Sequence, residues 1–175
     1  MSKTEGKWLA QAGATTGQIL IWNGNTWTPG KLSDYGLEGD LGSLYISSPA
    51  GKAITAGVPA IIGGTTTAIK NKNFTHTNQR LTYTGTVPKT FQATATISAK
   101  SSLGNIILSI FLAKNGVVVA ESEMTRKLAT ANDVGSAAIL CVDDCVTDDY
   151  VEVWVDVSSD STITFDKMVL TIVEI

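Results

Sequence analysis

The sequence predicts an all-β protein, with an antiparallel sandwich in residues 71–175 and an extended attachment or stalk segment in residues 1–70. Two observations support this prediction. In the second part, apolar and polar residues alternate over runs of strand length, and turn signals separate these runs at regular spacing. In the first part, Gly, Thr and Pro recur every few residues, and alternation is short-lived. The change in pattern near residue 70 predicts the boundary between the two parts.

The composition favours a folded protein whose main partner is neither nucleic acid nor a membrane. Of its 175 residues, 43% are hydrophobic and 17% are charged, and the net charge is −3. This apolar content suffices for a core, but no basic stripe is present to neutralise phosphates. No apolar run approaches the roughly 20 residues of a membrane span, and the N-terminus lacks a signal-peptide pattern. We therefore expect synthesis in a cytoplasm without a signal peptide, and no membrane insertion.

The first predicted element is a small β-hairpin at residues 18–28. Strand-like residues flank Asn23-Gly24, a dipeptide that favours a type I′ turn because both positions tolerate positive φ. A two-stranded hairpin buries too little surface to be stable alone. Trp22 and Trp27 are therefore expected to pack against another chain, and Trp8 is expected to serve in the same N-terminal docking.

Residues 31–67 show no long alternating run. Ser33 suits the N-cap of a short helical turn, and residues 57–67 read as extended chain ending in a flexible Gly-Thr linker. Almost 40 residues of loop are unusual inside a compact domain. We therefore expect an extended connection, or short β-elements that lie against partner chains.

The strands of the sandwich follow from period-two alternation. Residues 91–99 place Phe91 and every second residue on one face, which is the pattern of a half-buried strand. The clearest run is residues 150–157, in which valines face in and Glu152, Trp154 and Asp156 face out. Further strands are expected at residues 81–84, 106–113, 117–119, 135–142, 163–165 and 168–173. Eight antiparallel strands in two sheets is the number found in jelly rolls.

A string in the N-terminal part resembles a module of bacteriophage fibres. Residues 13–29 read Gly-Ala-Thr-Thr-Gly-Gln-Ile-Leu-Ile-Trp-Asn-Gly-Asn-Thr-Trp-Thr-Pro. This order of Gly, Gln and Trp is similar to a short module common in tail-fibre and head-fibre proteins of bacteriophages. The resemblance implies a fibre or stalk context.

The order of motifs from residue 74 onward resembles the trimeric jelly rolls of the tumour-necrosis-factor and complement-C1q type. Thr84-Gly85-Thr86-Val87-Pro88 precedes the alternating strand that Phe91 opens, and Lys114-Asn115-Gly116 ends an apolar strand. Residues 148–153 stand at the family's Gly-Asp-x-Val-x-Val turn, with Asp148 in place of its Gly. The resemblance implies a homotrimer around a threefold axis.

Together, the two resemblances imply a structural virion protein of a bacteriophage. It would be a trimeric head fibre, tail fibre or capsid-decorating protein that docks on another virion protein through its N-terminus. The jelly roll would project outward and contact the host surface. The alternative is a carbohydrate-binding adhesin, in which exposed Tyr150 and Trp154 and the nearby acidic loop contact a surface glycan.

The residues do not predict an enzyme, a cofactor or a metal centre. The only histidine, His76, stands between threonines and is expected to be an ordinary surface or interface residue. Cys141 is expected to be a buried free thiol and Cys145 to lie in a turn, since zinc requires further ligands. The four aspartates in residues 143–149 lack the spacing of a Ca²⁺ loop and are expected to form a solvated loop tip. A glycoside hydrolase that uses two of these carboxylates is a third alternative.

Overall fold

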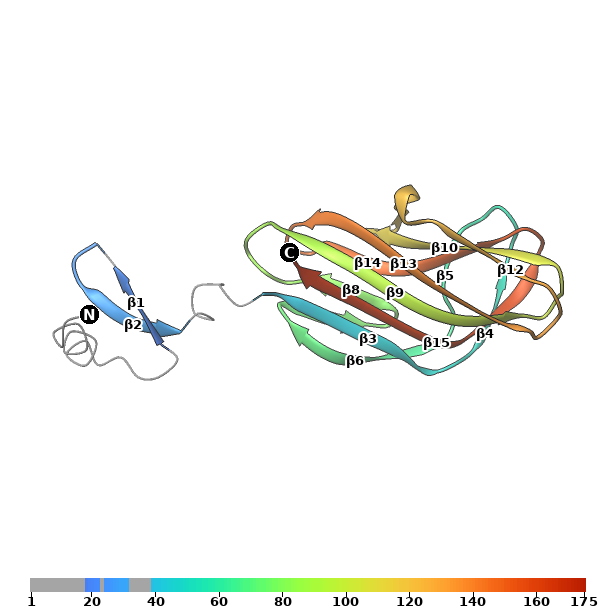
Figure 1. Cartoon of the computed structure of the whole chain (residues 1–175), viewed down its shortest axis with the longest axis horizontal. Coiled ribbons are helices and arrows are strands. Elements are labelled where there is room, and N and C mark those ends of the chain that lie inside the picture. The colour runs from blue at the N-terminus through green and yellow to red at the C-terminus, as the bar shows by residue number, and fades with distance from the viewer. Residues whose placement is uncertain (1–17, 23, 32–38) are drawn as a thin grey trace, which may run out of the picture. The chain divides into compact units, whose positions relative to one another are not determined.

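The computed structural model describes residues 18–22, 24–31 and 39–175, and the chain divides into two compact units between Gly39 and Asp40 (Figure 1). Trp8 and the helical turn expected at Ser33 lie outside the described residues. The predicted boundary near residue 70 is wrong, because residues 41–72 form strands of the sandwich. The strands at residues 51–54 and 60–61 are short, and those at residues 41–48 and 65–72, with eight residues each, show no sustained alternation of apolar and polar residues.

The first unit contains the predicted hairpin. β1 (Gln18–Trp22) and β2 (Trp27–Lys31) pair antiparallel, and Trp22 lies opposite Trp27 at the turn. Gly24 has a φ of 96°, which an L side chain rarely adopts. The second strand extends beyond its predicted end at Thr28, since a proline is tolerated in an edge strand.

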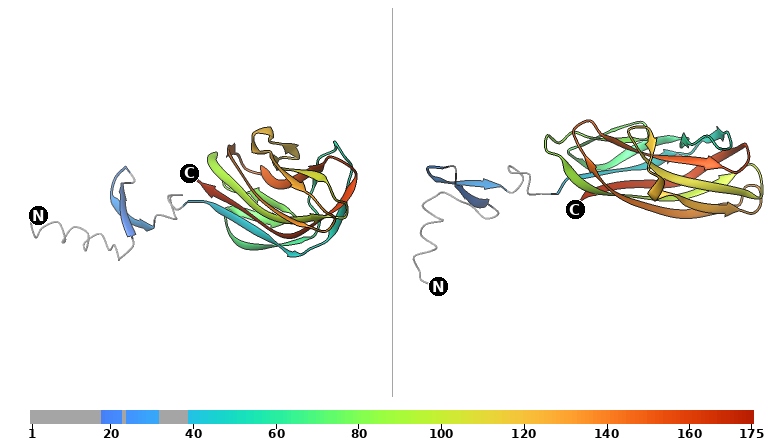
Figure 2. Two further views of the ribbon diagram at one scale, coloured as in Figure 1. Left: turned by 45° about the vertical axis from the view of Figure 1, so that its right-hand side comes forward. Right: turned by 90° about the horizontal axis from the view of Figure 1, so that it is seen from above.

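The second unit is an antiparallel sandwich of two sheets, which Figures 1 and 2 show packed face to face. The six-stranded sheet contains, in spatial order, β13 (Val134–Cys145), β9 (Lys89–Ser101), β15 (Ser161–Glu174), β3 (Leu41–Ser48) and β6 (Thr65–Lys72), with β4 (Gly51–Ile54) beside β15. The seven-stranded sheet contains β11 (Val117–Val118), β10 (Ile106–Lys114), β14 (Tyr150–Val157), β8 (Arg80–Tyr83) and β7 (Phe74–Thr77), with β12 (Met124–Leu128) beside β10 and β5 (Ala60–Ile61) beside β14. The prediction of an all-β jelly-roll sandwich is confirmed, although the region expected to be an extended connection adds strands to the predicted eight.

The core lies between the two sheets and follows the alternation seen in the sequence. The inward residues of β9 and the valines of β14 are buried, as predicted. At one end, Phe74, Tyr83 and Phe91 form an aromatic cluster with ring centroids 5.0 to 5.3 Å apart. Leu44 of β3 is fully buried in the same core. Burial of a side chain of this kind stabilises by roughly 1.5–3 kcal/mol, so β3 is an integral part of the sandwich.

Candidate functional site

The outer face of the six-stranded sheet exposes several aliphatic side chains. On β13, the odd-numbered residues turn toward the core and the even-numbered residues turn outward, as strand geometry requires. Val134, Leu140 and Val142 are therefore each about half exposed, and Val169 of β15 and Tyr45 of β3 are exposed on the same face. Isolated exposed aliphatics are normal, but several on one face indicate an interaction surface.

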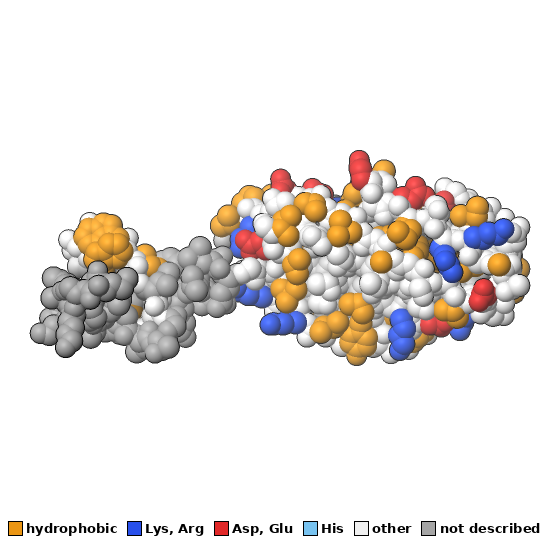
Figure 3. Space-filling view, in the orientation of Figure 1, with side chains coloured by type: hydrophobic (Ala, Val, Ile, Leu, Met, Phe, Trp, Pro, Cys, Tyr) orange, Lys and Arg blue, Asp and Glu red, His pale blue; other side chains and the backbone are white. Residues whose placement is uncertain are grey.

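Two shallow grooves lie between these aliphatic residues. One groove, of about 510 Å³, is lined on its outward side by Thr96, Ser98, Ser136, Ala138 and Val169. The second, of about 460 Å³, lies beside it and is lined in part by Leu140, Met124, Glu121 and Glu123. In Figure 3, hydrophobic side chains are spread over the middle of this face, and most charged side chains lie toward its ends and edges. The face combines a low charge with hollows that a neighbouring protein surface can fill.

The hairpin presents the second apolar surface. Trp22 and Trp27 are 51% and 59% exposed, and their ring centroids lie 5.5 Å apart with the planes tilted by 52°. Leu20 and Pro29 are opposite each other on the same face of the ribbon. The structure thus brings together the two tryptophans that the sequence selected for docking.

Trp154 and Tyr150 were expected to be exposed, but both are only partly exposed and contact neighbouring side chains. The indole N–H of Trp154 donates to Oε2 of Glu152 at 2.9 Å, and Glu152 is only 3% exposed. Arg80 donates from Nε to Oε1 of Glu152 at 2.9 Å, and its guanidinium lies 3.6 Å from the centre of the Tyr150 ring. The two predicted residues therefore belong to a cluster whose organising members, Arg80 and Glu152, the sequence did not select.

The acidic loop is closed on itself. Asp149 accepts hydrogen bonds from the backbone N–H of Val146 at 3.0 Å and from the side-chain amide of Asn115 at 2.7 Å. Lys114 forms ion pairs with Asp149 and with Asp143. Burial alone would raise the pKa of Asp149, but these hydrogen bonds outweigh it and lower the pKa. The carboxylate of Asp149 thus stabilises the conformation of its own loop. Among the described residues, no cluster suited to a metal ion occurs.

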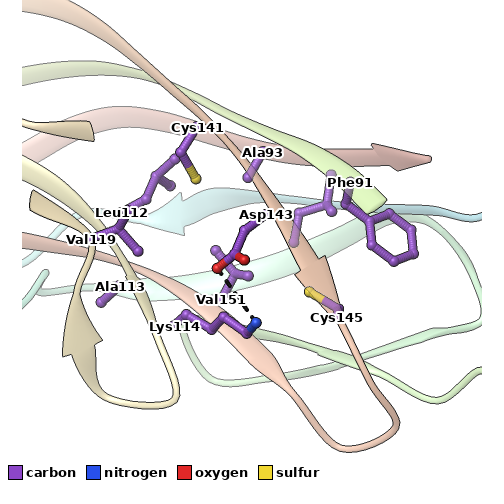
Figure 4. Close-up of a pocket in the computed structure, with 11 residues that line it drawn as sticks. Phe91, Ala93, Leu112, Ala113, Lys114, Val119, Cys141, Asp143, Cys145 and Val151 are labelled. Carbon is purple, nitrogen blue, oxygen red and sulfur yellow. Dashed lines mark ion pairs between the residues drawn. The ribbon is translucent and has the colours of Figure 1, made fainter. Parts of the chain in front are cut away.

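The cysteines are placed in the reverse of the expected order. Cys145 is buried on β13, whereas Cys141 is only partly buried. Both line a cavity between the sheets of about 10 Å³, which Figure 4 shows together with the ion pair of Lys114 and Asp143. Burial raises the pKa of the Cys145 thiol to about 11. A cavity of this size holds about one water molecule, so it is not a substrate pocket.

His76 is a half-buried residue of β7. Its Nε2 lies 2.8 Å from the hydroxyl oxygen of Thr66, which itself donates to the backbone carbonyl of Asn78. These contacts hold the turn between β7 and β8 against β6. The contacts of His76 therefore stabilise the fold, in agreement with the ordinary role expected for this residue. No helix in residues 18–31 or 39–175 has the length and apolar character needed to cross a membrane.

Comparison with known proteins supports the fold. No family model and no curated protein matches the chain. Crystal structures of murine APRIL align over 79% of this chain and 100% of their own, at 6% identity and TM-scores of 0.54 and 0.55. The globular domain of zebrafish complement 1qA aligns over 76% of this chain and 94% of its own at 11% identity and a TM-score of 0.47.

The PRD1 vertex protein P5 aligns over 78% of this chain and 96% of its own, at 14% identity and a TM-score of 0.47. Similarities with TM-scores below 0.5 support no inference of their own. The match to murine APRIL, together with the sheet topology, shows a jelly-roll sandwich. At 6% identity it shows the fold alone.

Proposed function

We propose that this chain is a structural protein of a bacteriophage particle, a trimeric head fibre, tail fibre or capsid-decorating protein. The hairpin unit docks on another virion protein, and the jelly roll is displayed outward, where it contacts the host surface. The virion context rests on the resemblance of residues 13–29 to a fibre module. The number of subunits rests on the resemblance of the later motifs to trimeric jelly rolls.

The observation that carries the proposal is the outer face of the six-stranded sheet. The outward residues of β9 are Thr90, Gln92, Thr94, Thr96, Ser98 and Lys100, a row with a single charge. Leu140, Val142 and Val169 add exposed aliphatic surface beside this row. Short side chains lose little rotamer entropy when they are covered, whereas each fully buried aliphatic side chain contributes about 1.5–3 kcal/mol. Such a face favours association with a further copy of the chain.

A threefold ring uses this face in a head-to-tail manner. In a cyclic trimer, one patch of each subunit packs against a different patch of the next, and the ring closes after three copies. The edge strand β13 carries Leu140 and Val142 at the border of the face. We expect this border to lie against the first groove of the neighbouring subunit, because the short side chains of Thr96, Ser98, Ser136 and Ala138 leave room there.

The hairpin supports the docking part of the proposal. A two-stranded ribbon without a third element is marginally stable, and aromatic residues are enriched in protein–protein interfaces. With more than half of each residue's surface exposed, Trp22 and Trp27 offer apolar area that a partner protein can cover. A Trp22→Ala, Trp27→Ala variant should retain the sandwich and lose attachment to the particle.

The first test is the solution mass of the full chain by light scattering. We expect three times the 18.4 kDa of one chain. Leu140→Lys, which places a charge at the border of the face, should yield a monomer. Ile107→Lys is the matched control, because Ile107 is 47% exposed on the seven-stranded sheet and Leu140 is 51% exposed. A monomeric wild type would refute the trimer, and equal masses for the two variants would refute the use of this face in the association.

Virion location has its own test. Mass spectrometry of purified particles of a phage that encodes this chain should detect it in a stoichiometric amount. Its absence from such particles would contradict the virion part of the proposal, even if the protein is a trimer in solution.

A further inference from the structure

A small polar pocket lies beside β14, at the point where pairing along one of its edges passes from β8 to β5. Residues Tyr150 to Glu152 pair with β8, and Trp154 and Val155 pair with β5. Since β8 begins at Arg80 and β5 ends at Ile61, a gap remains between the two strand ends. The pocket in this gap has a volume of about 150 Å³ and is lined by Ile61, Thr77, Asn78, Gln79, Arg80 and Glu152.

The guanidinium of Arg80 is held rigidly at the pocket. Its Nε and Nη2 both bind Oε1 of the buried Glu152, at 2.9 and 2.8 Å, and its plane lies over the ring of Tyr150. The indole N–H of Trp154 donates a hydrogen bond to the other oxygen of this carboxylate. These contacts use two of the five N–H donors of the guanidinium. The positive charge of Arg80 is balanced by Glu152, so the pocket offers fixed donors without an excess of charge.

The turn between β7 and β8 adds further polar groups. Thr77 and Asn78 are exposed at the pocket, and Asn78 adopts a φ of 53°. The side-chain nitrogen of Gln79 donates to the carbonyl of Gly64, so its oxygen remains an acceptor. The hydroxyl of Thr66 binds the backbone carbonyl of Asn78 and fixes the turn. Both donors and acceptors thus line the cavity, together with the apolar side chain of Ile61.

We infer that this pocket binds one neutral pyranose ring of a glycan. Neighbouring hydroxyls of a sugar each donate and accept a hydrogen bond, which suits a lining that combines the donors of Arg80 with the amide and hydroxyl groups of Asn78, Thr77 and Gln79. The balanced Arg80–Glu152 pair gives an anion no advantage. The cavity is smaller than the roughly 300–1,000 Å³ of sites for drug-sized ligands, so it accommodates a single ring.

Contacts within the protein already hold Arg80, Gln79 and the backbone of Asn78, which lowers the cost of ordering them on binding. For a ligand with about a dozen non-hydrogen atoms, ordinary ligand efficiencies correspond to a Kd on the order of 1 mM. The inference does not depend on the proposed trimer. The side chains of Arg80 and Glu152 lie on the outer side of the seven-stranded sheet, whereas the proposed association uses the other sheet. In a trimer, three such pockets would strengthen a weak contact through multivalency.

The test is saturation-transfer NMR on the full chain with the methyl glycosides of glucose, galactose and N-acetylglucosamine, each at about 10 mM, which exceeds the expected Kd. Thr77→Val, Asn78→Gly removes the hydroxyl and the amide while it preserves side-chain shape at 77 and the positive φ at 78. Thr130→Val, Asn132→Gly is the matched control, because Asn132 also has a positive φ, of 62°, in an exposed loop elsewhere. Glycerol serves as the polyol control.

We expect saturable signals from at least one glycoside with the wild type and with the control variant, and affinity weakened about tenfold or more in Thr77→Val, Asn78→Gly. A second variant, Arg80→Met, Glu152→Gln, removes the guanidinium but leaves an acceptor for Trp154, and should also lose binding. Absence of signal from all three glycosides, equal binding of glycerol, or unchanged affinity in a folded pocket variant would overturn the inference. Light scattering of the same samples reports separately on the trimer.

Discussion

A buried ion cluster at one end of the sandwich gives the sharpest test of what stabilises the second unit. Nζ of Lys89 lies 2.9 Å from Oδ2 of Asp40 and 2.9 Å from Oε2 of Glu174. Asn73 and Tyr83 also donate to the carboxylate of Asp40, which is 2% exposed. Lys89→Met keeps most of the aliphatic stem and removes the ammonium. It therefore leaves a buried carboxylate without its counter-charge.

The expected cost follows from burial. Removal of one partner from a buried ion pair typically costs 3–5 kcal/mol, and we expect about 3 kcal/mol here because Asp40 retains two other donors. The matched control is Lys100→Met on the same strand. Lys100 pairs with Asp166, but the two side chains are 36% and 30% exposed. Loss of such an exposed pair costs about 0–1 kcal/mol.

Urea unfolding followed by far-ultraviolet circular dichroism, at one protein concentration for all samples, measures both losses. Asp40→Asn in the Lys89→Met background should restore part of the stability, because the unpaired charge is then removed as well. Equal losses in Lys89→Met and Lys100→Met would refute the reasoning, since burial would then not decide the energy of the pair.

The pH dependence follows from the pKa of Asp40. Burial alone would raise it, but hydrogen bonds from Lys89 and Asn73 outweigh burial and lower the pKa below its usual 3.8. A carboxyl with a lowered folded-state pKa stabilises the protein above the unfolded-state pKa, and this contribution is lost as the pH falls through the folded-state value. The stability difference between wild type and Lys89→Met should therefore shrink below about pH 4. A difference that stays constant between about pH 6 and pH 3 would contradict this assignment.

Two further predictions concern the extent of the sandwich and its thiols. A fragment of residues 40–175 should unfold cooperatively when followed by circular dichroism. A fragment of residues 71–175 should not, because it lacks β3 to β5, most of β6 and the buried Leu44. Cooperative unfolding of the shorter fragment would support the boundary near residue 70. Ellman's reagent at about pH 8 should label Cys145→Ser faster than Cys141→Ser, since burial raises the pKa of Cys145 to about 11. Equal labelling rates would contradict the difference in burial.

The sequence alone determined the local features of this protein. Period-two alternation identifies the inward residues of β9 and β14, because successive side chains of any strand point to opposite faces. Asn23-Gly24 identifies the hairpin, because few residue pairs accept the backbone of a tight turn. The fold class follows from the number and spacing of such strands. None of these inferences requires knowledge of which strand lies beside which.

The features that only the tertiary structure decided all depend on partners far apart in the chain. Glu152 faces outward by alternation, yet it is buried, because Arg80, 72 residues away, and Trp154 close over it. The strands of residues 41–72 belong to the sandwich because β3 pairs with β15 near the C-terminus. The polar pocket beside Arg80 exists because β8 and β5 end against the same edge of β14. Alternation defines the face on which a side chain lies, but strand pairing decides what covers that face.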